Sequence, residues 1–320
     1  MRIVSLLPAA TEWLCAFGAA DQIVGRSHEC DFPPEVKDRP VVTRATFDGA
    51  GDSAAIDRAV RDTLVQGLSL YDVDLDTLRE LEPDLVVTQA QCEVCAVSLD
   101  GLEAALADWT GGQPELFSLA PTTFKQVLDT TLRLGRRIDR TAAAMQFIAE
   151  RERELRLLRE RIGARRDGTV AGREAPSVVC IEWIEPLMTA GHWMPGLVEL
   201  AGGRALLAEG GAPSPYVAWD DIVAADPDVL AVTACGFPVE QSLRDLGYLT
   251  RRSQWLELRA VREGRAFVLD GNAYFNRPGP RLYRSVELLA AVLHPDRADV
   301  RPEPWEVVRV GAEQVDTLAP

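Results

Sequence analysis

The sequence predicts an α/β protein made of two Rossmann-like lobes that are joined by a single long helix. Three observations support this fold class: a helix–strand pattern that occurs twice, apolar segments with the length of buried strands, and a long charged helical segment between the two copies. At 320 residues the chain is long enough for two domains of roughly 100–200 residues each.

The helix–strand pattern is an approximate internal repeat. Residues 76–88 read as a helix that runs into a buried strand, and residues 220–233 read the same way. In both copies a Pro-Asp pair separates the helix from the strand. Short apolar runs of this kind are typical of parallel strands that are buried on both faces. The repeat predicts two similar lobes, although this pattern also recurs by chance among α/β proteins.

The segment between the two copies predicts the connecting helix. Residues 122–138 are expected to form one helix and residues 140–162 a second, whose alternating charges between Glu150 and Arg156 are typical of an exposed helix with i,i+4 pairs. About 23 residues at a rise of 1.5 Å span roughly 35 Å, which suits a rigid spacer. The expected parts are an N-terminal lobe (1–138), a backbone helix (139–163), a C-terminal lobe (164–295) and a C-terminal tail (296–320).

The first residues predict a strand rather than a secretory leader. Residues 2–7 are expected to form a strand, residues 8–11 a loop and residues 12–17 a helix. A leader fits less well because only one basic residue is present and Pro8 interrupts the apolar run. We therefore expect a cytoplasmic protein, or a periplasmic or extracytoplasmic one if the N-terminus is truncated. The six cysteines are then expected to be reduced thiols.

Charge and motifs favour a binding protein over other classes. The formal net charge is −15, which repels phosphate backbones and anionic lipid, so neither nucleic acid nor a membrane surface is an expected partner. No apolar run reaches the ~20 residues that span a bilayer. The sequence contains neither a glycine-rich phosphate loop nor a Gly-x-Ser-x-Gly motif. An enzyme that uses Cys92 or Cys95 as a nucleophile or redox pair is the less favoured alternative.

Cysteine and histidine residues follow two of the predicted strands. Cys92 and Cys95 form a Cys-x-x-Cys motif after the first repeat strand, and His28, Glu29 and Cys30 follow another short strand. Open α/β sheets bind ligands at the carboxyl ends of their strands. His28, Cys30, Cys92 and Cys95 could therefore bind a metal ion, line a polar ligand site, or be structural thiols.

Aromatic residues in the C-terminal lobe predict stacking on a large flat ligand. The candidates, which lie in or near loops after predicted strands, are Trp183, Trp193, Trp219 and Phe275. Packing within the lobe is the alternative for about half of them. His192 precedes the N-terminus of a predicted helix and is a candidate ligand contact, whereas His294 is expected on the surface at the end of the last helix.

A set of short motifs resembles the periplasmic cobalamin-binding proteins of ABC importers, in which two α/β lobes are joined by one long helix. The resemblance covers roughly residues 2–294, and the chain is most similar to a subgroup without a signal peptide. The motifs are IVSLLPAATE at 3–12, DFPP at 31–34, LEPDLV at 81–86, TAG at 189–191, AGG at 201–203, VAW at 217–219 and FNRPGPR at 275–281.

This resemblance implies a protein that binds cobalamin or another corrinoid in a cleft between its lobes, as a substrate-binding, carrier or sensor protein. It also implies a monomer and an ABC permease as partner. An alternative ligand is a metal ion, metal cluster or metal chelate, and His28 or a thiolate could ligate cobalt directly. The residues expected to contact the ligand are Pro8, His28, Glu29, Cys30, Tyr71, Gln89, Gln91, Cys92, Cys95, Trp183, His192, Trp193, Trp219, Phe275, Asn276 and Arg277.

Overall fold

The computed structural model describes residues 1–66, 69–89, 102, 113–165 and 168–311. The chain forms two compact units, each with a mainly parallel sheet flanked by helices, as the predicted α/β class requires. Unit 1 comprises Met1–Gly51, Ala55–Pro121 and Lys125–Glu150, and unit 2 comprises Asp52–Ala54, Thr122–Phe124 and Arg151–Pro320. The expected boundaries at residues 138, 163 and 295 stay a prediction.

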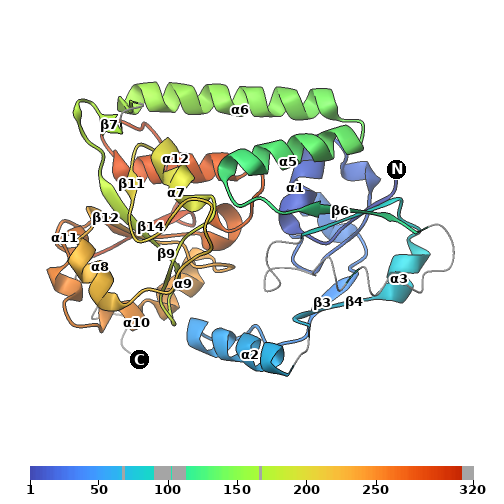
Figure 1. Cartoon of the computed structure of the whole chain (residues 1–320), viewed down its shortest axis with the longest axis horizontal. Helices are drawn as coiled ribbons and strands as arrows, with labels where there is room; N and C mark the ends of the chain where they lie inside the picture. The colour runs from blue at the N-terminus through green and yellow to red at the C-terminus, as the bar shows by residue number, and fades with distance from the viewer. Residues whose placement is uncertain (67–68, 90–101, 103–112, 166–167, 312–320) are drawn as a thin grey trace. The chain divides into compact units, whose positions relative to one another are not determined.

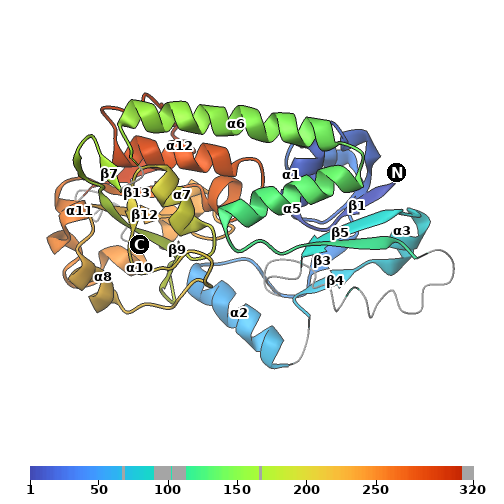
Figure 2. The same ribbon diagram turned by 45° about the horizontal axis from the view of Figure 1, so that its top comes forward.

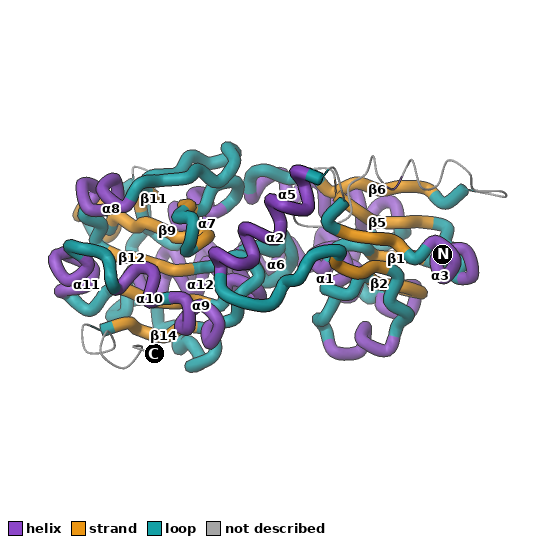
Figure 3. Tube along the Cα trace, turned by 90° about the horizontal axis from the view of Figure 1, so that it is seen from below, coloured by secondary structure: helices purple, strands orange, loops and turns teal. Residues whose placement is uncertain are grey.

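Unit 1 is built on a four-stranded parallel sheet with the strand order β2-β1-β5-β6 (Figure 3). Its strands are β1 (Ile3–Ser5), β2 (Ile23–Arg26), β5 (Leu85–Gln89) and β6 (Glu115–Leu119). The two central strands, β1 and β5, are completely buried, which explains their largely apolar sequence. The carboxyl ends of all four strands lie at one edge of the sheet, because the strands are parallel.

The helices α1 (Pro8–Ala16) and α5 (Phe124–Arg137) lie on one face of this sheet (Figure 2). Trp13 of α1 stacks on Phe17 with 5.7 Å between ring centroids, and its edge meets Phe147 at 5.6 Å. The predicted loop at residues 8–11 is wrong, because α1 begins at Pro8. Proline is tolerated at the first helical position, where its missing N–H would have no partner within the helix.

A pair of antiparallel strands extends unit 1 beyond the four-stranded sheet. Strands β3 (Thr43–Ala45) and β4 (Tyr71–Val73) pair antiparallel, and α2 (Ser53–Val65) lies between them in sequence. After β4 comes α3 (Leu75–Glu80), whose N-terminus is capped by Asp74. The first predicted helix–strand unit is therefore present as α3 followed by β5. The described residues of this unit also form two short 3₁₀ helices, η1 (Ala20–Gln22) and η2 (Pro34–Asp38).

The long helix of the prediction is α6 (Thr141–Ile162), within one residue of the expected start and ending at the expected residue. Its residues up to Glu150 belong to unit 1 and those from Arg151 onward to unit 2. Among the helices of the described residues, none is both long and apolar enough to cross a membrane.

Unit 2 contains a larger mixed sheet with the strand order β10-β9-β12-β13-β14, and β11 also pairs with β9. The strands β11, β9, β12 and β13 are parallel, whereas β10 and β14 run antiparallel to their neighbours. The bounds are β9 (Ser177–Trp183), β10 (Met188–Thr189), β11 (Arg204–Ala205), β12 (Val229–Val232), β13 (Ala266–Leu269) and β14 (Val307–Val310), with a separate hairpin of β7 (Thr169–Val170) and β8 (Arg173–Glu174).

Helices cover both faces of this second sheet. Figure 1 shows α7 and α12 on one side and α8 to α11 on the other. The bounds are α7 (Met194–Leu200), α8 (Trp219–Ala225), α9 (Val239–Asp245), α10 (Gly247–Thr250), α11 (Arg259–Arg262), α12 (Leu282–Leu293), the 3₁₀ helix η3 (Trp255–Glu257) and the π-helix η4 (Gly271–Phe275). The second predicted helix–strand unit is present as α8 followed by β12.

Candidate functional site

The carboxyl edge of the unit 1 sheet holds a small aromatic cluster. The imidazole of His28, after β2, lies 5.8 Å from the ring of Tyr71, and Phe47 meets Tyr71 edge-on at 6.3 Å. His28 Nδ1 is 2.8 Å from the hydroxyl of Thr43, which also accepts the backbone N–H of His28 at 3.1 Å. Burial, with Arg26 nearby, lowers the pKa of His28, so its imidazole is neutral at pH 7.

Two predicted contact residues of unit 1 have buried side chains. The Cys30 thiol is completely buried and accepts a hydrogen bond from Thr11 Oγ1 at 3.0 Å, with Ser27 Oγ 3.4 Å away. Pro8 is also buried, at the start of α1. We therefore assign both residues a packing role, in which the thiol ties the loop after β2 to α1.

Gln89 and Glu29 lie at the same edge of this sheet. Gln89 ends β5 and is buried, and the backbone N–H of Glu29 donates to Ser27 Oγ at 3.2 Å. Gln91, Cys92 and Cys95 lie outside the described residues. Among the residues that the structure describes, no three His, Cys, Asp or Glu side chains gather as a metal site would require. The four-ligand metal cluster stays a prediction.

In unit 2, the carboxyl ends of β9, β12 and β13 bring together a second set of residues. Trp183 is the last residue of β9, and its ring centroid lies 5.2 Å from that of Phe237. Glu182 precedes it, and its Oε2 accepts a hydrogen bond from Ser214 Oγ at 2.8 Å. Burial raises the pKa of Glu182 to about 7, while the hydrogen bond from Ser214 lowers it.

A pair of loops holds His192 at this edge. The His192 backbone N–H donates to Ala212 at 2.7 Å, and its carbonyl accepts from Gly211 at 2.9 Å. Its φ of 50° lies in the left-handed region, which a non-glycine residue rarely adopts and which marks functional loops more often than ordinary ones. Burial lowers the pKa of His192, so its imidazole is also neutral at pH 7.

The segment after β13 contributes polar groups through the π-helix η4. π-helical turns are rare and are found mostly at functional sites. Asn276 donates its amide N–H groups to the carbonyls of Thr233 at 2.9 Å and Gly271 at 3.1 Å. The Arg277 guanidinium donates to Asn272 Oδ1 at 2.8 Å. These side chains are held in place at the edge by their own hydrogen bonds, which limits the entropy cost of ligand binding.

The remaining aromatic candidates are mostly buried. Phe275 is 0% exposed, and its carbonyl accepts the indole N–H of Trp193 at 2.9 Å. Trp219 begins α8, donates its indole N–H to Ser253 at 2.8 Å and stacks on Trp255 at 6.3 Å. Phe275 and Trp193 therefore support the edge by packing, while Trp183 and His192 keep part of their surface accessible.

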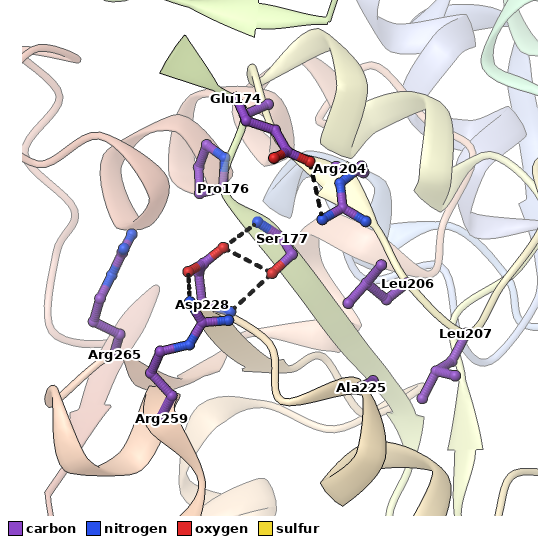
Figure 4. Close-up of a pocket in the computed structure, with 11 residues that line it drawn as sticks. Glu174, Pro176, Ser177, Arg204, Leu206, Leu207, Ala225, Asp228, Arg259 and Arg265 are labelled. Carbon is purple, nitrogen blue, oxygen red and sulfur yellow. Dashed lines mark hydrogen bonds and ion pairs between the residues drawn. The ribbon is translucent and has the colours of Figure 1, made fainter.

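A pocket of about 630 Å³ lies at the opposite, amino-terminal edge of the same sheet (Figure 4). Its wall includes Arg259, which pairs with Asp228 at 2.7 Å, and Arg265, which donates to the carbonyls at the end of α12. These arginines are already engaged in holding strand and helix ends together. We place the ligand site elsewhere, because ligands are expected at the carboxyl edge of a parallel sheet.

His294 does not lie on the surface as the sequence suggested. It is only 9% exposed, and its Nε2 lies 3.0 Å from the carbonyl of Gly202. The turn that ends α7 packs against the residue that follows α12, which is a tertiary contact that the local sequence does not reveal.

Sequence reasoning missed Glu182, Ser214, Phe237 and Asn272. One signal was present, because Glu182 is a charged residue near the end of an otherwise apolar strand. An acidic residue that a buried strand carries to the carboxyl edge is a candidate for function, since burial of an unpaired charge costs free energy.

Comparison with known proteins assigns the family. The model for the periplasmic binding protein family matches residues 3–273, which is most of the chain. The chain belongs to the periplasmic binding protein family. The prediction of a binding protein rather than an enzyme is confirmed by this membership.

Individual relatives are distant but cover nearly the whole binding protein. The vitamin B12-binding protein of Vibrio cholerae is 24% identical over 300 residues, covering 91% of this chain and 88% of the relative. Among solved structures, the periplasmic vitamin B12 binding protein BtuF of Vibrio cholerae has a TM-score of 0.62 at 18% identity, covering 94% of this chain and 98% of that one. A periplasmic heme binding protein from Pseudomonas aeruginosa has a TM-score of 0.69 at 19% identity, covering 96% and 97%.

The expected cytoplasmic location is wrong, because the family and the named relatives are periplasmic binding proteins. The expectation rested on a strand at residues 2–7 and on the poor fit of the first residues to a leader, and the strand forms at Ile3–Ser5. That strand shows only that these residues belong to the sheet.

Proposed function

We propose that this periplasmic binding protein binds cobalamin or another corrinoid as the substrate-binding component of an ABC importer. The carboxyl edges of its two sheets provide the ligand-contacting residues. On unit 1 these are His28, Tyr71 and Gln89, and on unit 2 they are Trp183, His192, Asn276 and Arg277. The proposal retains Gln91, Cys92 and Cys95 as candidates.

The observation that carries this proposal is the chemistry of the unit 2 edge. A corrinoid presents a large ring system that is bordered by side-chain amides. Trp183, supported by the buried Phe237, supplies an apolar surface. The hydrogen-bonding groups around it come from Glu182, Asn272, Asn276 and Arg277. Large apolar walls with a few fixed polar groups are typical of small-molecule sites. The Vibrio cholerae relative, a vitamin B12-binding protein, supports the same ligand class.

A metal chelate of the haem type is the second candidate. The observation that favours it is the His28–Tyr71 pair, because a neutral imidazole and a phenol are both ligands for transition metals. One of the structural relatives is named a heme binding protein. In either case His28 is the described residue that we propose as a ligand to the bound metal.

The first test is a titration of reduced, metal-stripped protein with cyanocobalamin, aquocobalamin and haemin. Isothermal calorimetry and visible absorption should show 1:1 binding of the cobalamins at micromolar affinity or tighter. A shift of the aquocobalamin absorption band that occurs on binding to wild type but not to His28→Ala would identify the imidazole as the cobalt ligand.

The three ligands separate the candidates. Binding of haemin without either cobalamin would replace the corrinoid by the metal chelate. Binding of none of the three ligands would contradict both the corrinoid and the metal-chelate candidates. The remaining candidate would be a metal ion held by the cysteines, which Zn²⁺ and Co²⁺ titrations of the same protein would test.

A further inference from the structure

Glu182 is held in a directional chain of hydrogen bonds at the unit 2 edge. The backbone N–H of Gly191 donates to Ser214 Oγ at 3.0 Å, and the Ser214 hydroxyl donates to Glu182 Oε2 at 2.8 Å. The backbone carbonyl of Glu182 accepts from Cys235 at 2.9 Å. The chain fixes one carboxylate oxygen and the backbone of this residue, so that Oε1 keeps a defined direction.

This carboxylate has no cationic partner among the described residues. The neighbouring acid, Glu185, pairs with Arg252 at 2.8 Å, whereas Glu182 forms no ion pair within the described chain. The pKa of Glu182, about 7, is raised by burial and lowered only by Ser214. A partly buried carboxylate costs free energy unless its remaining oxygen finds a donor. Glu182 is only partly buried, and its Oε1 is not enclosed by the described residues, so a donor on a bound ligand can take the place of water at this oxygen.

We propose that Glu182 is a specificity-determining residue that selects ligands bordered by side-chain amides over ligands bordered by carboxylates. The proposal rests on the corrinoid function proposed above. An amide N–H of a corrinoid would donate to Oε1, giving the charge-assisted hydrogen bond that the protein does not supply itself. A carboxylate, such as a haem propionate, would instead meet a second negative charge at Glu182, which no described cation pairs with.

The two ligand classes favour opposite charge states of Glu182. The charge-assisted hydrogen bond from an amide N–H needs the ionised form, so the affinity for the amide ligand is expected to rise as the pH rises through the pKa. Carboxylate binding needs the neutral form, so affinity falls over the same range. With a pKa of about 7, each affinity is expected to change about tenfold between pH 6 and pH 8, in opposite directions.

Other titratable groups occupy the elements around Glu182. They are Cys180 on β9, His192 beside Gly191, Tyr216 on the loop of Ser214 and Cys235 after β12. Burial raises the pKa of Cys180 to about 12, so that this thiol stays protonated throughout the range. Any pH dependence of the affinity that comes from His192 remains in Glu182→Gln, because this substitution removes only the Glu182 carboxylate. The difference between wild type and this variant therefore reports on Glu182.

The experiment measures the affinities of cyanocobalamin and of its derivative with one side-chain amide hydrolysed to a carboxylate, at pH 6, 7 and 8. Wild type should prefer cyanocobalamin, with the opposite pH trends above. In Glu182→Gln, the affinity for cyanocobalamin should fall about tenfold. The pH dependence that Glu182 gives to both affinities should disappear. The preference for the amide ligand should fall by at least tenfold, because the side-chain amide introduced by this substitution can donate to a carboxylate.

The matched control is Glu185→Gln, which makes the same change at a paired carboxylate and should keep both trends. Circular dichroism checks that each variant is folded. Cyanocobalamin binding with the same preference and pH trends in Glu182→Gln as in wild type would overturn the role of Glu182 while leaving the proposed function intact. A wild type that binds haemin and not cyanocobalamin would overturn both.

Discussion

The residue with the least room at the unit 2 edge is Gly271, the first residue of η4. A Cβ at this position would overlap the carbonyl oxygen of Ala234 and lie 2.7 Å from that of Thr233. These are backbone atoms of the loop after β12, so neither can rotate away. The absence of a side chain therefore allows the loops after β12 and β13 to approach each other and places Asn276 against Thr233.

Substitution Gly271→Ala is expected to lower the free energy of unfolding by about 1–3 kcal/mol or more, since overpacking forces the backbone to shift. Urea unfolding followed by circular dichroism measures this. Gly196 in α7 is the control, because nothing lies within 4 Å of the position that an alanine methyl group would take there, and alanine should be neutral or stabilise the helix by about 0.5–1 kcal/mol. Equal stability of the two variants would contradict the crowding argument.

At the residue scale, the sequence indicated where in the fold a residue lies better than whether its side chain is buried. His192 was expected before a helix N-terminus, and it does precede α7, whereas Asn276 and Arg277 were expected from the family resemblance. Contact of these three residues with the ligand stays a prediction. His294 was expected on the surface, yet it is buried against Gly202. Cys30, expected as a metal ligand, a ligand contact or a structural thiol, is buried against Thr11, which is also distant in sequence. Burial of a single side chain depends on tertiary packing, which local patterns do not encode.

At the scale of elements, Asp228 joins the start of β9 to α11. Its carboxylate accepts from the Ser177 backbone N–H at 2.8 Å and hydroxyl at 2.7 Å, and pairs with Arg259 at 2.7 Å (Figure 4). Burial raises the pKa of Asp228, but the hydrogen bonds from Ser177 and the nearby arginines together hold it below the usual range. The aspartate of the Pro-Asp pair thus anchors the start of β12, the strand that follows α8, to the start of its neighbour β9.

Substitution Asp228→Asn is expected to cost about 1–3 kcal/mol of stability at pH 7, as for other charged hydrogen bonds. Because the folded pKa is lowered, this contribution is complete above the unfolded value near 4 and is lost as the pH falls through the folded pKa. Urea midpoints at pH 7, 5, 4 and 3 should therefore converge for wild type and variant. Asp296→Asn, at an exposed position, should change little at any pH. A constant difference down to pH 3 would show that ionisation is not the cause.

The elements themselves were largely predictable from the sequence. The two helix–strand units and α6 are present because their apolar periodicity and length agree with their burial. The start of α1 was misread because proline suggests a loop when its position within the first turn is unknown. The antiparallel pair of β3 and β4 was not expected, since each strand is only three residues long.

At the scale of the whole molecule, family membership explains why no catalytic set was found in the sequence. The chemistry of this binding protein is recognition, and its parts are two sheets whose carboxyl edges carry aromatic and hydrogen-bonding side chains. The net charge of −15 carried by the whole chain disfavours anionic ligands in general, in agreement with a corrinoid bordered by neutral amides.

The proposed function requires that both units contact the ligand, and hydrogen exchange tests this directly. A ligand present at 100 times its Kd adds about 2.7 kcal/mol to any opening that releases it, which slows exchange through that opening about 100-fold. With cyanocobalamin, backbone amides of β1 and β5 in unit 1 and of β9 and β12 in unit 2 should therefore all gain protection. Protection confined to β9 and β12 would show that unit 2 binds the ligand alone, and His28 and Tyr71 would then have no part in recognition.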